Sequence, residues 1–332
     1  MTSATMTAWV RAVLLSVLLG MGALGAHAAD NDAAAQVARE ATQPSNNAPV
    51  WRAVNEPTAH TSTIKSPEAG VLIQAGGHEW SLFRNGVITV YGGWLLSLAL
   101  AGVALFFAAR GPIKLKEARS GKLVKRFTLV ERYSHWAVAI TFIALAITGV
   151  FIMWGRYFLL PIIGGNLYGP LLFAFKNIHN LVGPLFTISV IVMFVVYVRD
   201  NMPNGDDIKW LLSFGKRPAH RFNGGEKLWF WAGVTGLGIV VSWTGWVLNS
   251  TVPGIDYFSR DTMQLANIIH GIGATLFVLM SIGHIYIGSI GTEGAYDGMS
   301  SGYVDESWAK EHHSLWLDDV HAGGDHRGKR SA

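Results

Sequence analysis

The sequence feature that most constrains this chain is residues 265–290, LANIIHGIGATLFVLMSIGHIYIGSI, which contain no charged side chain. The run is long enough to cross a bilayer as one helix. It holds two histidines, His270 and His284, at depths where an unpartnered imidazole is costly. Their spacing corresponds to a rise of about 21 Å and a rotation of about 40° on an α-helix. The two rings therefore lie on one face, one toward each membrane surface, which suits two metal centres. The alternative for either histidine alone is an interhelical hydrogen bond.

Composition restricts both the class of protein and its chemistry. With 332 residues, 50% hydrophobic and 14% charged, the chain is predicted to be an integral membrane protein. Its net charge of +4 is small, and its Lys and Arg residues lie in particular loops. Nucleic acid is therefore not an expected partner. The absence of cysteine excludes cysteine-ligated iron–sulfur clusters, disulfides and thioether-attached haem within this chain. A redox metal here would be held by histidine or methionine.

The N-terminus has the pattern of an export signal. Arg11 precedes an apolar run, and Ala26-His27-Ala28 forms a small-x-small cleavage site. We therefore predict a signal peptide over residues 1–29, with an uncleaved anchor helix as the alternative. Residues 30–86 are polar and rich in Ala, Asn, Thr and Pro, which predicts an extracytoplasmic segment with little independent structure.

Hydropathy predicts five transmembrane spans in an all-α integral membrane protein. They cover residues 87–109, 133–154, 178–198, 228–248 and 265–290. Positive charge is concentrated in the loop 110–132 and in the loop between the third and fourth spans, which places both in the cytoplasm. The mature N-terminus is then outside, and the tail, residues 291–332, is cytoplasmic. Its histidines, 312, 313, 321 and 326, are expected to be exposed to solvent.

This topology predicts how four intramembrane histidines pair. His135 lies near the inner surface at the start of the second span, and His179 lies near the outer surface at the start of the third. The fifth span runs inward, which places His270 outside and His284 inside. By depth, His135 therefore pairs with His284, and His179 pairs with His270.

Two opposed imidazoles on facing helices are the ligands that a six-coordinate b-type haem needs. Glycines near the ligands, 183, 271, 273 and 283, leave room for a porphyrin, although close helix packing also explains them. Zinc is disfavoured because no carboxylate or cysteine joins either pair. A histidine-bearing transporter would usually add intramembrane Asp or Glu, and these spans have none. An anchor subunit without redox centres is disfavoured, because it would not need four aligned histidines.

Several sequence strings resemble the cytochrome b (gamma) subunits of respiratory formate dehydrogenases, within a wider family of nickel–iron hydrogenase cytochrome b subunits. They are RYSHW, NIHNLVG, NGGEKLWFW, IIHGIGATLFVLMSIGHIYIG and the tail string WAKEHH, within about residues 125–316. The resemblance implies a four-helix transmembrane bundle with two haems b, here residues 133–290, plus one extra N-terminal helix. It also implies residence in the bacterial inner membrane.

The resemblance further implies an electron path and its partners. A molybdenum or tungsten catalytic alpha subunit would oxidise formate, and an iron–sulfur beta subunit would pass electrons to the outer haem. The inner haem would reduce a quinone, either menaquinone or ubiquinone. Asn223 and Gly225 would contact the quinone, and Glu226 replaces the glutamine of many relatives, so its part in protonation is open. Asn and Glu three residues apart also predict a helix cap. The alternative within the family is a subunit of a nickel–iron hydrogenase or sulfur-compound reductase.

Overall fold

A computed structural model describes residues 60–61, 71–73, 76–255 and 260–327. The chain divides into two compact units, Met1–His78 and Glu79–Ala332. In the first unit, strand β1 (His60–Thr61) pairs antiparallel with β2 (Val71–Ile73). The predicted signal peptide and most of the predicted extracytoplasmic segment lie outside the described residues.

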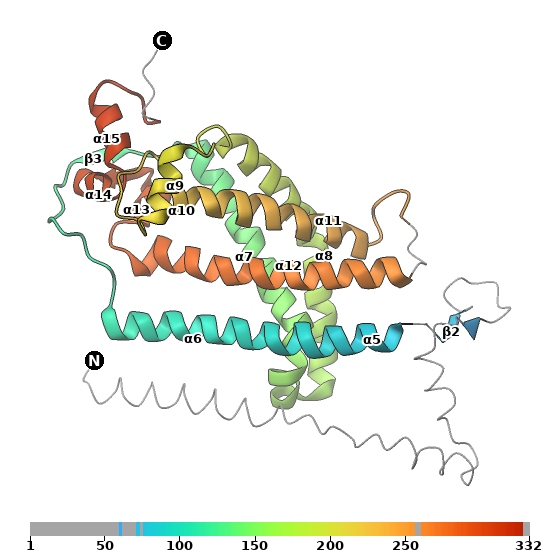
Figure 1. The fold of residues 1–332 in the computed structure, drawn as a ribbon. Helices are drawn as coiled ribbons and strands as arrows, with labels where there is room; N and C mark the ends of the chain where they lie inside the picture. The colour runs from blue at the N-terminus through green and yellow to red at the C-terminus, as the bar shows by residue number, and fades with distance from the viewer. Residues whose placement is uncertain (1–59, 62–70, 74–75, 256–259, 328–332) are drawn as a thin grey trace, which may run out of the picture. The chain divides into compact units, whose positions relative to one another are not determined.

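Within the described residues, five helical runs are long and apolar enough to cross a membrane, which confirms an all-α integral membrane protein. The runs are Gly77–Arg110, Leu129–Phe158, Leu160–Tyr197, Gly224–Leu248 and Arg260–Gly291. Figure 1 labels most of their parts: α5 (Gly77–Leu82), α6 (Gly92–Arg110), α7 (Leu129–Phe158), α8 (Leu160–Tyr197), α10 (Gly224–Leu228), α11 (Gly238–Leu248) and α12 (Arg260–Tyr286). Three π-helical segments complete the runs: η1 (Phe83–Tyr91), η2 (Trp229–Leu237) and η3 (Ile287–Gly291).

The second and third spans are longer than hydropathy predicts. A capping box starts α7 at Leu129, because Thr128 and Glu131 satisfy each other's backbone N–H groups. At its other end α7 continues to Phe158, and α8 begins at Leu160. The segment between the two predicted spans, residues 155–177, is therefore helical except at Leu159. Within α8 the backbone leaves helical geometry at Gly164, where φ is 73°, a left-handed value that glycine adopts at little cost.

The helices pack in a continuous series around one apolar core. Helix α7 lies along α8, α11 contacts both α8 and α12, and α6 lies along α12. The buried core residues are Phe127, Val138, Phe186, Val190, Met193, Tyr197, Phe222, Phe230, Val234 and Phe277. Because α12 contacts both α6 and α11, its two histidines lie among other helices of the bundle.

The loop after the first span, the loop after the third span and the C-terminal segment meet at one end of the bundle and fold together there. Strand β3 (Leu123–Lys125) pairs antiparallel with β4 (Tyr303–Asp305) of the C-terminal segment. The short helices at this end are α9 (Gly205–Leu212), α13 (Asp297–Ser301), α14 (Glu306–His312) and α15 (Ser314–His321). The tail is thus folded, with a core that includes Trp308 and Trp316.

The folded tail overturns the expected exposure of three of its four histidines: His313 is buried, His312 and His326 are half-buried, and His321 is exposed. His313 is only 1% exposed, because Trp308 and Trp316 enclose it. Its Nδ1 donates to the carbonyl of His220 at 2.7 Å, and its Nε2 accepts from Arg126 at 3.0 Å. Burial, followed by the nearby Arg126 charge, lowers the pKa of His313 to about 3, so the ring is neutral.

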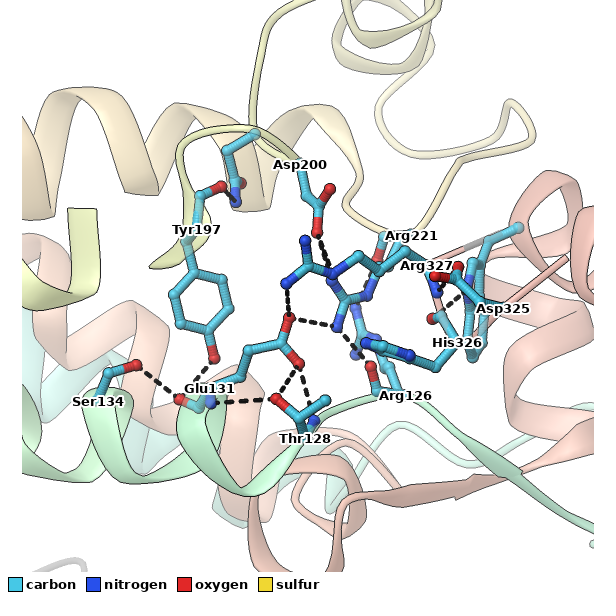
Figure 2. Close-up of polar contacts among 12 residues, drawn as sticks. Arg126, Thr128, Glu131, Ser134, Tyr197, Asp200, Arg221, Asp325, His326 and Arg327 are labelled. Carbon is cyan, nitrogen blue, oxygen red and sulfur yellow. Dashed lines mark hydrogen bonds and ion pairs between the residues drawn. The ribbon is translucent and has the colours of Figure 1, made fainter. Parts of the chain in front are cut away.

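A buried ionic network joins the loops at the same end (Figure 2). Arg221 binds Glu131 at 2.9 Å and Asp200 at 2.6 Å, and all three side chains are almost fully buried. Arg327 of the tail approaches the same two carboxylates, at 3.5 and 3.4 Å. Tyr197 donates its hydroxyl to the Glu131 carbonyl at 2.9 Å. The network therefore fixes the start of α7 to the loop after α8 and to the C-terminal segment.

Candidate functional site: two histidine pairs

The four predicted histidines form two facing pairs. The ring centres of His135 (α7) and His284 (α12) lie 6.1 Å apart, and those of His179 (α8) and His270 (α12) lie 6.2 Å apart. Two metal–imidazole bonds of about 2 Å, plus roughly 1 Å from each nitrogen to its ring centre, total about 6 Å. Each pair is therefore spaced to bind one metal ion from opposite sides.

A metal between such rings needs further ligands. Within the described residues, no group of three or more His, Asp and Glu side chains comes together as a metal site. Each pair offers only two nitrogen ligands, whereas structural and catalytic zinc sites use three or four protein ligands. The donor set instead suits an iron whose four equatorial ligands come from a porphyrin.

Two threonines hold the rings of the His179–His270 pair. Thr148 donates its hydroxyl to the Ala144 carbonyl at 2.7 Å, and its oxygen lies 2.9 Å from Nδ1 of His179. Thr244 repeats this arrangement with the Val240 carbonyl, 2.7 Å away, and Nδ1 of His270, 3.0 Å away. Because each hydroxyl proton is used on the backbone, each oxygen accepts from the ring N–H. The assigned tautomer leaves Nε2 free to bind iron.

These threonines did not emerge from the sequence as functional residues. The available signal was a Thr-Gly dipeptide in the second and fourth spans, Thr148-Gly149 and Thr244-Gly245. Each glycine faces the same imidazole that its threonine binds. A Cβ at Gly149 would lie 3.5 Å from His179, and one at Gly245 would lie 3.4 Å from His270. Each dipeptide thus combines a hydrogen-bond acceptor with a small neighbour beside the ring.

A cavity of about 470 Å³ adjoins the His179–His270 pair. This volume lies in the range of small-molecule and cofactor sites. The lining is largely apolar and includes Gly183, which was singled out from the sequence. Among the described residues, no atom lies within 4 Å of a Cβ built at Gly183 beyond its own helix backbone and chain neighbours. A flat macrocycle has room there. By contrast, Gly273 contacts Val240 and Val241, so its small size serves helix packing.

The His135–His284 pair is held differently. Trp229 of η2 stacks on His284, with ring centres 5.0 Å apart and planes at 19°. Gly233 makes this possible, because a Cβ at that position would overlap the Trp229 ring. The buried Nδ1 of His135 has no hydrogen-bond partner among the described residues. A polar atom in that state fits a site completed by a bound group.

Aromatic side chains lie midway between the two pairs. Phe277 is seven residues from both His270 and His284, so it falls halfway along α12. It packs against Phe142 at 4.7 Å and Phe186 at 6.0 Å between ring centres. Phe186 and Phe277 are almost fully buried, at 2% and 3% exposure. The space between the pairs is therefore largely filled by apolar side chains.

The predicted quinone residues lie at the start of the fourth span. Asn223 caps α10: its Oδ1 accepts from the Glu226 N–H, and Glu226 accepts from the Asn223 N–H, both at 2.9 Å. Glu226 also binds Arg126 at 3.0 Å, while its side chain remains 36% exposed. A Cβ at Gly225 would meet Trp210 at 3.1 Å. The capping interpretation of Asn223 and Glu226 is therefore confirmed, and one short turn connects them to Trp229 beside His284.

Fold and site together define a class: a helical membrane protein with histidine pairs suited to a haem held between its helices. A sequence model of the prokaryotic cytochrome b561 family matches residues 126–302, and this chain belongs to that family. Membership implies haem b, and the pairs described above fit it. The extra N-terminal span lies outside the matched region.

Three curated proteins similar to this chain are all named as cytochrome b556 subunits of formate dehydrogenases. The chain is 28% identical to the formate dehydrogenase cytochrome b556(fdo) subunit of Escherichia coli strain K12 over 210 residues, covering 59% of this chain and 93% of the relative. It is 27% identical to the nitrate-inducible cytochrome b556(Fdn) subunit of the same strain over 209 residues, covering 60% and 92%. A formate dehydrogenase cytochrome b556 subunit of Haemophilus influenzae is 27% identical over 195 residues, covering 56% and 78%.

Proposed function

We propose that this chain is the membrane cytochrome b subunit of a formate dehydrogenase, carrying electrons from an iron–sulfur partner to a quinone. His179 and His270 ligate one haem b, and His135 and His284 ligate a second. Bound haem b supplies reversible one-electron transfer. The observation that carries the proposal is the spacing of the two pairs, 6.1 and 6.2 Å between ring centres.

The chain's own residues orient the rings of one pair and set the polarity of the space between the two pairs. Thr148 and Thr244 orient their histidines and keep Nε2 unprotonated. The phenylalanine layer around Phe277 makes the surroundings between the pairs apolar, which lowers the local dielectric constant. With one histidine on each side, a haem held by either pair would have no coordination position left for oxygen.

The proposed orientation in the bacterial inner membrane places the His135–His284 pair toward the cytoplasm. The loops after the first and third spans meet at that end, and both carry the excess of Lys and Arg expected of cytoplasmic loops. The His179–His270 pair then faces outward. There the iron–sulfur beta subunit would dock, together with a molybdenum or tungsten alpha subunit that oxidises formate.

The quinone site is proposed at the start of the fourth span. Trp229 stacks on His284, and Asn223, Gly225 and Glu226 lie immediately before it in the chain. Glu226 is accessible and bound to Arg126, so a carboxylate is available near this pair for proton exchange. The capping bonds occupy Oδ1 and the backbone N–H of Asn223. The two N–H groups of its side-chain Nδ2 are left for a quinone carbonyl.

Haem binding is tested by the absorption spectrum of the purified full-length protein. The proposal requires low-spin b-type haem at about two per chain, because four histidines make two axial pairs. His179→Ala and His270→Ala should remove one and the same centre, and His135→Ala and His284→Ala the other. His321→Ala, at an exposed tail histidine, is the control and should keep both. Loss of the same centre in His135→Ala and His270→Ala would refute the pairing.

The quinone role is tested against the capping role with two substitutions at one position. Asn223→Ser keeps a good N-cap and removes the amide, whereas Asn223→Ala removes both. Slower quinone reduction in both variants, with both haems still reducible by the partner, supports quinone binding. Normal kinetics in Asn223→Ser would leave capping as the only function of Asn223. Partner identity is tested by co-purification with a molybdenum or tungsten protein that oxidises formate.

A further inference from the structure

The N-terminal span lies outside the family match at residues 126–302, yet it forms part of the cavity at the His179–His270 pair. Arg84, Ile88 and Leu96 of this span line the cavity together with both histidines. Ile88 and Leu96 are buried, at 5% and 8% exposure. The extra span is therefore one wall of this cavity.

Specific contacts hold this wall in place. Trp154 of α7 donates its indole N–H to the Thr89 carbonyl at 2.7 Å, within the π-helical segment η1. A Cβ at Gly93 would lie 2.9 Å from the same indole nitrogen, so this position needs a glycine. Ile88 lies 3.4 Å from a Cβ built at Gly271, the residue after His270. The span is fitted closely to the ligand-bearing helix α12.

Two cationic side chains line the cavity. Arg84 donates from Nε to the Asn267 side chain at 3.0 Å, and Asn267 precedes His270 by three residues. Lys176 precedes His179 by three residues and also lines the cavity. Residues three apart on a helix share a face. Lys176 therefore lies about one helical turn from His179, and Arg84 is bound to a residue about one helical turn from His270.

The charge of the lining is unbalanced, because its residues include Arg84 and Lys176 but no Asp or Glu from the described chain. Haem b has an apolar macrocycle and two propionate carboxylates, which matches an apolar cavity with two cations. We infer that Arg84 and Lys176 bind the propionates of the haem held by His179 and His270. The N-terminal span is then part of the haem site, an inference that rests on the proposed haem ligation.

The test is a redox titration of the purified full-length protein, followed by absorption and electron paramagnetic resonance. Ferric haem carries one more positive charge than ferrous haem, so a nearby cation favours the reduced form. Arg84→Gln should lower the midpoint potential of one haem only. The expected change is on the order of tenfold in the reduced-to-oxidised ratio at fixed potential, or 59 mV for one electron. Lys176→Gln should shift the same haem in the same direction.

Matched variants separate charge from structure. Arg84→Lys keeps the charge and should retain most of the wild-type potential, while Arg110→Gln, exposed at the opposite end of the same span, should leave both potentials unchanged. Repeating Arg84→Gln in His284→Ala, which keeps only the His179–His270 haem, should reproduce the shift. Lys176 is exposed, so Lys176→Gln is expected to fold. It therefore tests the inference even if Arg84→Gln does not fold.

Two outcomes would overturn the inference, and they are distinguishable. If the wild-type protein binds two haems while Arg84→Gln and Lys176→Gln leave both potentials unchanged, the cations do not bind the propionates. If the wild-type protein lacks b-type haem, the proposed function fails and this inference fails with it.

Discussion

In the proposed two-haem arrangement, replacing Thr148 with valine should loosen the haem at the His179–His270 pair and leave the other in place. Valine has nearly the same shape, so the change removes the hydroxyl and little else. The hydroxyl oxygen lies 2.9 Å from Nδ1 of His179, and Thr148 is only 4% exposed. Water therefore cannot readily replace the lost acceptor, and the imidazole N–H stays buried without a partner.

The expected cost follows from that lost contact. Leaving a buried donor unsatisfied costs about 1–3 kcal/mol. Removing a second-shell partner of a metal-bound histidine typically lowers metal affinity about 10–100-fold, which is about 1.4–2.8 kcal/mol. The two estimates agree. We therefore expect haem at the His179–His270 pair to dissociate about 10–100 times faster, assuming an unchanged association rate.

The assay is the rate of haem transfer from purified protein to an excess of a haem-binding apoprotein. Thr141→Val is a matched control one heptad earlier on α7. Its hydroxyl donates to the Ala137 carbonyl at 2.7 Å, as Thr148 donates to Ala144, but it contacts no ligand histidine. Thr148→Ser keeps the hydroxyl and should stay near wild type. Equal haem-transfer rates in Thr148→Val, Thr141→Val and the wild type would refute the reasoning.

Two further predictions concern the folded end of the bundle. Glu131→Gln weakens the buried pair with Arg221 but leaves Asp200 as its partner, so unfolding in detergent should cost about 2–3 kcal/mol less; an unchanged transition would contradict this. The pKa of His313 is about 3 when folded and 6.5 when unfolded, because burial and Arg126 disfavour the charged ring. The unfolded state thus binds more protons between these values, and stability should fall below pH 6.5 by up to about 1.4 kcal/mol per unit. Melting temperatures from pH 5 to 7.5 should fall less steeply in His313→Gln, and identical slopes would refute the assignment.

The transmembrane architecture could be predicted from the sequence because it depends on length and hydropathy alone. The positions of His135, His179, His270 and His284 along their spans also anticipated which rings face each other, since depth follows from span direction. The ends of the helices were predicted less well from the sequence. The polar cap at Thr128 and the break at Gly164 are local backbone features that hydropathy does not register.

The supporting residues could not be found from the sequence because they act across helices. Thr148 and Thr244 have ordinary intramembrane surroundings, and only the packing of α7 on α8 and of α11 on α12 brings them to a histidine. Arg84 lies more than ninety positions from the nearest ligand of its cavity, His179. The tail was mispredicted for a similar reason, since its polar composition concealed a small core around Trp308 and Trp316.

The two histidine pairs differ in how their rings are held, and this difference allows each centre to be altered alone. At His179 and His270, hydrogen bonds to threonine fix the tautomer and the rotation of both rings. At His284 the ring is held by stacking on Trp229, and stacking fixes a plane without choosing a protonated nitrogen. Substitutions at Thr148 should therefore act on one centre through ligand basicity. Substitutions at Trp229 should act on the other through ring orientation and access to the proposed quinone site.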